Sequence, residues 1–143
     1  MAEPALETAY KALANRLRTP GELWGTNARV SAVKSGTSYP YVLYFWAGGG
    51  EVQINGFRHA NLRIAVLCIS DKMSDAATGA GRISDLIREK GKQTSPADYL
   101  NGSSDWDILT ITEEELIYVA EGTPDTITAY RWGAYYRFVM QAT

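Results

Sequence analysis

The side chains that could do chemistry are few, and they lie far apart in the sequence. His59 is the only histidine, and no serine or cysteine stands at a spacing that would make His59 its catalytic base. Asp105 and Asp107 could bind a cation, but no histidine or third carboxylate near them completes a ligand set. We therefore expect His59 to have a surface or structural role and the two aspartates to be solvated at the start of a strand.

Three further features look like chemical sites but have simpler explanations. Cys68 alternates with Ile64 and Val66 in an apolar run, which favours a buried, inert thiol. The Gly79-Ala-Gly81 run falls inside a predicted helix and not at a strand end, where a phosphate-binding loop belongs, so it indicates close helix packing. Consecutive glutamates from Glu113 to Glu115 would alternate between the faces of a strand, and such charges at an edge block unwanted pairing. The sequence predicts no catalytic residue, no cofactor-binding residue and no metal ligand, and therefore no enzyme.

Composition sets the class of the protein. At 143 residues the chain has the common size of one domain, and we assign residues 1–143 to a single domain. One cysteine allows no disulfide within the chain, and an N-terminus that carries Glu3 and Glu7 does not look like a secretory signal, so we expect a reducing cytoplasm. A net charge of -2 lacks the basic footprint of a nucleic-acid-binding protein, and no apolar run reaches the ~20 residues of a membrane span.

Apolar periodicity predicts an α+β fold. Residues at three- and four-residue spacing predict two amphipathic helices, and β-branched or aromatic runs predict the strands. The expected fold is a mainly antiparallel β-sheet flanked by two helices, in the order α-β-β-β-α-β-β. The predicted helices are Ala5 to Arg18 and Asp71 to Gly91, and the predicted strands are Ala28 to Val33, Tyr39 to Trp46, Asn61 to Ile69, Trp106 to Ala120 and Thr126 to Gln141.

Gly48, Gly49 and Gly50 are expected to end the second strand, because three glycines cost too much backbone entropy for a strand interior. The polar stretch from Glu51 to Ala60 is then a long loop. Residues 112–120 have two readings, since Thr112 with Glu115 matches a helix capping box while the surrounding residues are β-rich. We favour a strand there, because the last strand needs a partner.

Aromatic residues are in excess near the ends of the predicted strands. A two-helix domain of this size can hardly cover both faces of such a sheet, so we expect part of the aromatic surface to be covered by another subunit. As interface residues we predict the glycine-rich loop and the aromatic last strand, namely Gly48, Gly49, Gly50, Glu51, Gln53, Asn55, Trp132, Tyr135 and Tyr136.

The order of elements and the local sequence resemble the tail terminator, or tail completion, proteins of long-tailed bacteriophages. The likeness rests on the first helix ending at Leu17-Arg-Thr-Pro-Gly21, the strand entry Pro40-Tyr-Val-Leu-Tyr44 and the run Leu62-Arg-Ile-Ala-Val-Leu-Cys68. An alanine-rich helix follows, and the chain ends in the aromatic strand from Tyr130 to Met140. No catalytic signature contributes to this resemblance.

The resemblance implies a structural virion protein that is assembled in the host cytoplasm. Such a protein forms a hexameric ring on the last ring of tail tube subunits, stops tube growth and joins the tail to the head connector. Its partners would be itself, the tail tube protein and a head-tail connector or head-closure protein, and DNA would pass through the ring without sequence-specific binding. The alternatives are another neck protein, such as a head-tail adaptor or head-closure protein, or a small-ligand-binding α+β domain.

Overall fold

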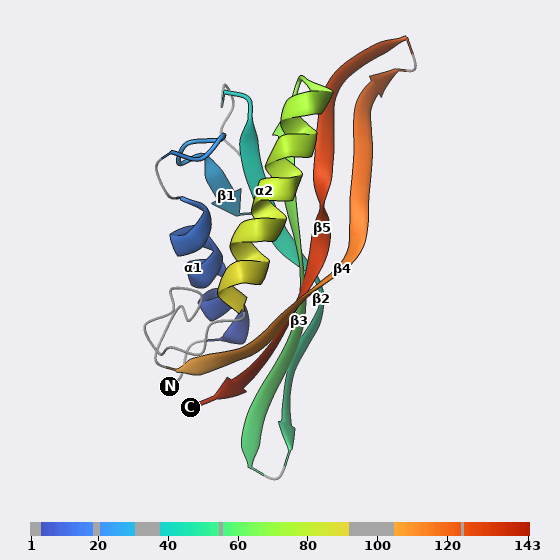
Figure 1. The fold of residues 1–143 in the computed structure, drawn as a ribbon. Coiled ribbons are helices and arrows are strands. Elements are labelled where there is room, and N and C mark those ends of the chain that lie inside the picture. The colour runs from blue at the N-terminus through green and yellow to red at the C-terminus, as the bar shows by residue number, and fades with distance from the viewer. Residues whose placement is uncertain (1–3, 19–20, 31–37, 55, 92–104, 124) are drawn as a thin grey trace.

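The computed structural model describes residues 4–18, 21–30, 38–54, 56–91, 105–123 and 125–143 (Figure 1). Two helices and five strands follow one another in the predicted order α-β-β-β-α-β-β, so the predicted fold class is confirmed. The elements are α1 (Ala5–Leu17), β1 (Ala28–Val30), β2 (Tyr41–Ile54), β3 (Phe57–Ser70), α2 (Met73–Gly91), β4 (Trp106–Thr123) and β5 (Thr126–Ala142).

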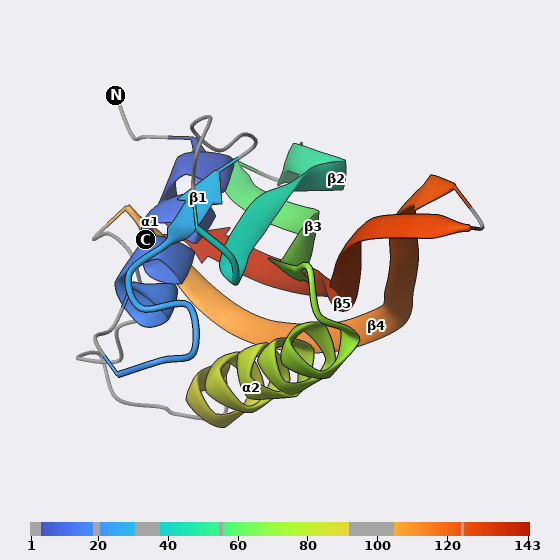
Figure 2. The same cartoon turned by 90° about the horizontal axis from the view of Figure 1, so that it is seen from above.

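The five strands form one sheet in the order β1-β2-β3-β5-β4. β1 pairs with β2 in parallel, and every other pair is antiparallel. Both helices contribute to the same core cluster as alternate residues of β2, β3 and β5, so they cover one face of the sheet (Figure 2). α2 packs against β3, β4 and β5, and α1 packs near β1 and β2.

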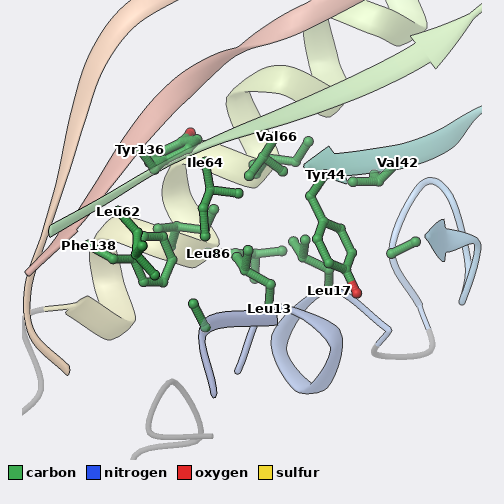
Figure 3. Close-up of a cluster of buried hydrophobic side chains, with 14 of the residues drawn as sticks. Leu13, Leu17, Val42, Tyr44, Leu62, Ile64, Val66, Leu86, Tyr136 and Phe138 are labelled. Atoms are coloured by element: carbon green, nitrogen blue, oxygen red, sulfur yellow. The ribbon is translucent and has the colours of Figure 1, made fainter. Parts of the chain in front are cut away.

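The core between helices and sheet is built from the predicted apolar stripes. Leu13 and Leu17 of α1 meet Leu86 of α2 on the helix side of the sheet, together with Ile64 and Val66 of β3 (Figure 3). Apolar residues at helical spacing and at every second strand position face the same interior, which is why these elements could be predicted from sequence.

A smaller apolar cluster lies on the opposite face of the sheet. Tyr41, Leu43, Leu67, Ile69 and Ala129 form it, and no helix of the described chain belongs to it. The sheet is therefore covered by helices on one face and by its own side chains on the other.

The second strand does not end at the glycines, so that prediction was wrong. β2 passes through Gly48, Gly49 and Gly50 and continues to Ile54, with a bulge between Trp46 and Gly48. Gly48 and Gly49 have φ values of 141° and 78°, which residues other than glycine rarely adopt. A Cβ on Gly49 would stand 1.9 Å from the carbonyl oxygen of Asn61. Glycine is needed here because the bulge brings the two backbones together.

The predicted loop from Glu51 to Ala60 is also wrong. Glu51 pairs with Ala60 and Gln53 pairs with Arg58, so the segment forms the end of a β2–β3 hairpin. Figure 1 shows this hairpin extending beyond the helices. Its polar composition follows from that position, because strands with no core to cover need no apolar face.

The C-terminal third is a strand pair, and the helical reading of residues 112–120 is excluded. β4 pairs with β5 along its length, with bulges after Ile108, Glu113 and Glu121. The capping-box pattern at Thr112 is overridden because β5 offers a long partner. β4 continues to Thr123, three residues beyond the predicted strand end, and β5 begins at Thr126, whose N–H donates to Oγ1 of Thr123 at 3.1 Å. Residues 31–33 of the first predicted strand lie outside the described residues.

Candidate assembly surfaces

The candidate chemical residues are scattered. His59 is a half-buried residue of β3, and Asp107 is an exposed residue of β4. Among the residues that the structure describes, no group of three or more His, Cys, Asp or Glu side chains could hold a metal ion. None of the described helices is both long and apolar enough to cross a membrane.

The Cys68 thiol is enclosed between β3 and α2. It is fully buried, and burial together with the nearby Asp75 raises the pKa of Cys68 to about 12. A Cβ placed on Gly79 would stand 2.2 Å from the Cys68 Sγ, so Gly79 allows α2 to lie directly against the thiol. The burial of the thiol and the close helix packing predicted from sequence are both confirmed.

The base of the β2–β3 hairpin is held by α1. The N–H of Trp46 donates to the Tyr10 hydroxyl at 2.8 Å, and the backbone N–H of Ala5 donates to Oε1 of Glu51. Oε2 of Glu51 accepts from Arg58 at 2.8 Å. The sequence has no side-chain cap at Pro4, and Glu51 supplies an acceptor to the α1 N-terminus from the hairpin.

These contacts set the charge state of Glu51. Partial burial disfavours the carboxylate, but the hydrogen bonds from Ala5 and Arg58 and the charge of Arg58 outweigh burial and lower the Glu51 pKa. Glu51 is thus ionised and tied to its own chain, whereas the sequence marked it only as an interface residue.

The hairpin nevertheless presents apolar surface. Val52 is 56% exposed, Phe57 is 62% exposed and Trp46, at the bulge, is 50% exposed. Trp46 also lines a shallow pocket of about 260 Å³ with Pro4, Leu6 and Leu62. Gly50, Glu51 and Gln53 are exposed, and Asn55 lies outside the described residues.

The three aromatic residues predicted as interface lie in different environments. Tyr136 is 1% exposed, and its hydroxyl donates to Oε1 of Glu113 at 3.1 Å, so it is a core residue of this chain (Figure 3). Tyr135 is half-buried, with the Arg63 guanidinium 3.7 Å from its ring centroid. Trp132 is half-buried between the rings of Tyr118 and Tyr130.

The sequence did not single out the β4 side chains around Trp132. Leu116 is 53% exposed and Tyr118 is 61% exposed on the side of α2, and Val119 is 46% exposed. With Ala77 and Ala80 of α2, Leu116 and Tyr118 line a groove of about 300 Å³. The available signal was apolar residues at consecutive positions from Leu116 to Val119, which gives a strand two apolar faces.

The open face of the sheet carries paired charges. Arg63 lies within 3.5 Å of Glu114 and 3.2 Å of Glu115, and Nε of Arg137 donates to Glu114 at 3.0 Å. The hydrogen bond from Arg137 is the main reason that the Glu114 pKa is lowered. Each of these charged side chains has an oppositely charged partner within the chain, which is typical of a protein surface and not of a reactive site.

This arrangement offers exposed apolar surfaces, and the described residues hold no cluster that could bind a metal ion. A solved chain of the virion of a native gene transfer agent particle has a similar fold, with a TM-score of 0.66 and 16% sequence identity. The fold is similar to that of a virion chain. The likeness covers 96% of this chain and 98% of that one, so the whole topology is shared and not a common core alone. No protein-family model and no curated protein matches the sequence.

Proposed function

We propose that this chain is a structural subunit of a phage-like particle and, more specifically, a tail terminator. The observation that carries the proposal is the end-to-end likeness of its fold to a chain of a gene transfer agent virion. The resemblance of its sequence to tail terminator proteins supports the finer assignment. As such a subunit it forms a ring on the last ring of the tail tube, stops tube growth and joins the tail to the head connector.

The surfaces suit a role in assembly. Two long hairpins extend from opposite ends of the body and expose large apolar residues, Phe57 and Val52 on one and Tyr118 and Leu116 on the other (Figure 1). Exposed apolar residues at projecting elements are typical of protein interfaces. Because Tyr136 is buried, we now place the interface on Gly48, Gly49, Gly50, Glu51, Gln53, Trp132 and Tyr135 together with these exposed apolar residues.

The β2–β3 hairpin is the element that we assign to the tube or to an adjacent subunit. It stands clear of the core, and Val52 and Phe57 add exposed apolar area to a hairpin that is otherwise largely polar. Val52→Ser with Phe57→Ser should leave thermal unfolding unchanged and reduce attachment to the tube. The matched control is Gln53→Ser, an exposed change on the same hairpin that removes no apolar area.

The experiment that tests the proposal is removal of the chain from the particle it serves. Loss of a terminator leaves tube growth unchecked, so electron microscopy should show tails of variable and excessive length that lack heads. Loss of a head-tail adaptor or head-closure protein should leave tails of normal length, and that result would assign the chain to a different neck position. Particles of normal form and infectivity would refute a structural role.

A second measurement tests the ring itself. Electron microscopy of the purified protein, alone and mixed with tail tube protein, should show sixfold rings in at least one of the two samples. A strict monomer in both would contradict the assignment.

A further inference from the structure

The two edges of the sheet have opposite chemical character. β4 and β1 are the outermost strands, and Figure 2 shows β1 and the end of the β4–β5 hairpin on opposite sides of the molecule. The ring proposed above requires each subunit to offer two different, complementary surfaces, because a head-to-tail contact repeats around the ring. The sheet edges supply such a pair, and this inference rests on the proposed function.

The surface at the β4 edge is apolar and acidic. Residues 113–130 contain five acidic residues and no lysine or arginine; Glu114 and Glu121 pair with Arg137 and Arg131 of β5, so the exposed carboxylates of Glu115 and Asp125 give this edge its charge. Leu116, Tyr118 and Val119 are exposed there, and Ile127 on β5 is 43% exposed. Glu115 contacts Arg63, but its side chain is 74% exposed, and Asp125 is exposed at the end of the hairpin. We call Glu115, Leu116, Tyr118, Val119 and Asp125 the acidic edge.

The surface at the β1 edge is apolar and basic. Residues 16–30 contain three arginines and one acid, Glu22, which accepts two hydrogen bonds of 2.8 Å from Arg82. Arg82 thereby neutralises that acid. Arg18 and Arg29 are exposed, and in the same segment of the chain Leu23 and Val30 are 42% and 39% exposed. We call Arg18, Leu23, Arg29 and Val30 the basic edge.

A hydrogen bond and a packing contact order the residues of the basic edge. Nε of Arg18 donates to the Ala28 carbonyl at 2.8 Å, which fixes the end of α1 to the start of β1. Leu23 approaches α2 at Gly79, so the loop after α1 is packed on the helix and not free of it. A surface that is already ordered loses little entropy when a partner binds.

We propose that the acidic edge of one copy binds the basic edge of a second copy of this chain. Opposite charges rim apolar residues on both surfaces, so the contact buries Tyr118 and Leu116 against Leu23 and Val30 while the charges set the orientation. A contact between two identical edges would place like charges together and is disfavoured. Each copy uses both edges, so the contact repeats in one direction and can close a ring.

Charge reversal on both edges tests this contact in the full chain. Glu115→Lys and Arg29→Glu should each weaken self-association by about tenfold or more, measured by mass photometry and sedimentation. The double variant Glu115→Lys, Arg29→Glu should recover most of the association, because every copy then has exchanged charges. Tyr118→Ser should also weaken association without changing the salt dependence. Glu7→Lys, an exposed change on α1, is the control.

The outcomes separate this inference from the proposed function. Circular dichroism should show folded protein for every variant, since each altered side chain is exposed. Rings that form equally well in wild type and in both single reversals would overturn the edge contact and leave the terminator role standing. A lack of recovery in the double variant would also overturn it. A wild-type chain that stays monomeric with and without tail tube protein would overturn both.

Discussion

The contact between α2 and Cys68 gives a sharp prediction about stability. Alanine at position 79 would place a Cβ 2.2 Å from the Cys68 Sγ and 2.8 Å from its Cβ. Rotation about χ1 could move the buried Sγ but not the Cβ of Cys68, so a shift of α2 or β3 is needed to relieve the overlap. Overpacking of this kind costs roughly 1–3 kcal/mol. Because the added Cβ would lie so much closer to the sulfur than van der Waals contact, we take the upper value, about 3 kcal/mol, as the overpacking cost of Gly79→Ala.

The intrinsic helix preference acts in the opposite direction. Replacing glycine by alanine inside a helix contributes about 1 kcal/mol of stability. The expected net loss is therefore about 2 kcal/mol, or a fall in Tm of roughly 6–10 °C for a domain of this size. Gly81→Ala is the matched control, because nothing lies within 4 Å of the Cβ that it would add. Gly81→Ala should raise the Tm.

Thermal and urea unfolding of the two variants measure the difference. The combination Cys68→Ala with Gly79→Ala should recover part of the lost stability, because it removes the sulfur and leaves the Cβ contact at 2.8 Å. If Gly79→Ala proves as stable as Gly81→Ala, α2 does not pack on Cys68 as described, and the explanation of this glycine is incorrect.

Three further predictions concern individual side chains. Glu51→Gln should lower the free energy of unfolding by about 1 kcal/mol, as loss of a helix cap does. The folded pKa of Glu51 is lowered, so the stability that its carboxylate contributes is present above its unfolded pKa and is lost as pH falls through the folded pKa. Urea titrations from pH 7 to pH 3 should therefore show that Glu51→Gln loses less stability with acid than wild type, with Glu7→Gln as control. The Cys68 thiol should resist alkylating reagents at pH 8 until the chain unfolds, since burial keeps it protonated; labelling of the native protein at the rate of a free thiol would contradict this. His59→Ala and Asp107→Asn should each keep both the fold and particle assembly, and loss of infectivity with assembly intact would point to an active site.

Much of the fold could be read from the sequence because each element follows its own periodicity. The apolar faces of α1 and α2 and the alternation through Ile64, Val66 and Cys68 depend only on residue spacing, and the structure places them in one core. The last strand was predictable for the same reason, although its register was not.

Contacts between distant parts of the chain decided the rest. The strand continues through Gly49 because the backbone of Asn61, twelve positions later, lies directly against it. Residue spacing in the sequence cannot reveal that contact. Residues 112–120 fit a helix locally, and pairing with β5 makes them a strand. Tyr136 looked like any other aromatic of β5, but helix packing buries it while Trp132 stays half-exposed. The sequence by itself determined which residues are apolar and at what period, and only the tertiary structure decided which apolar residues are covered, because covering requires a partner element from elsewhere in the chain.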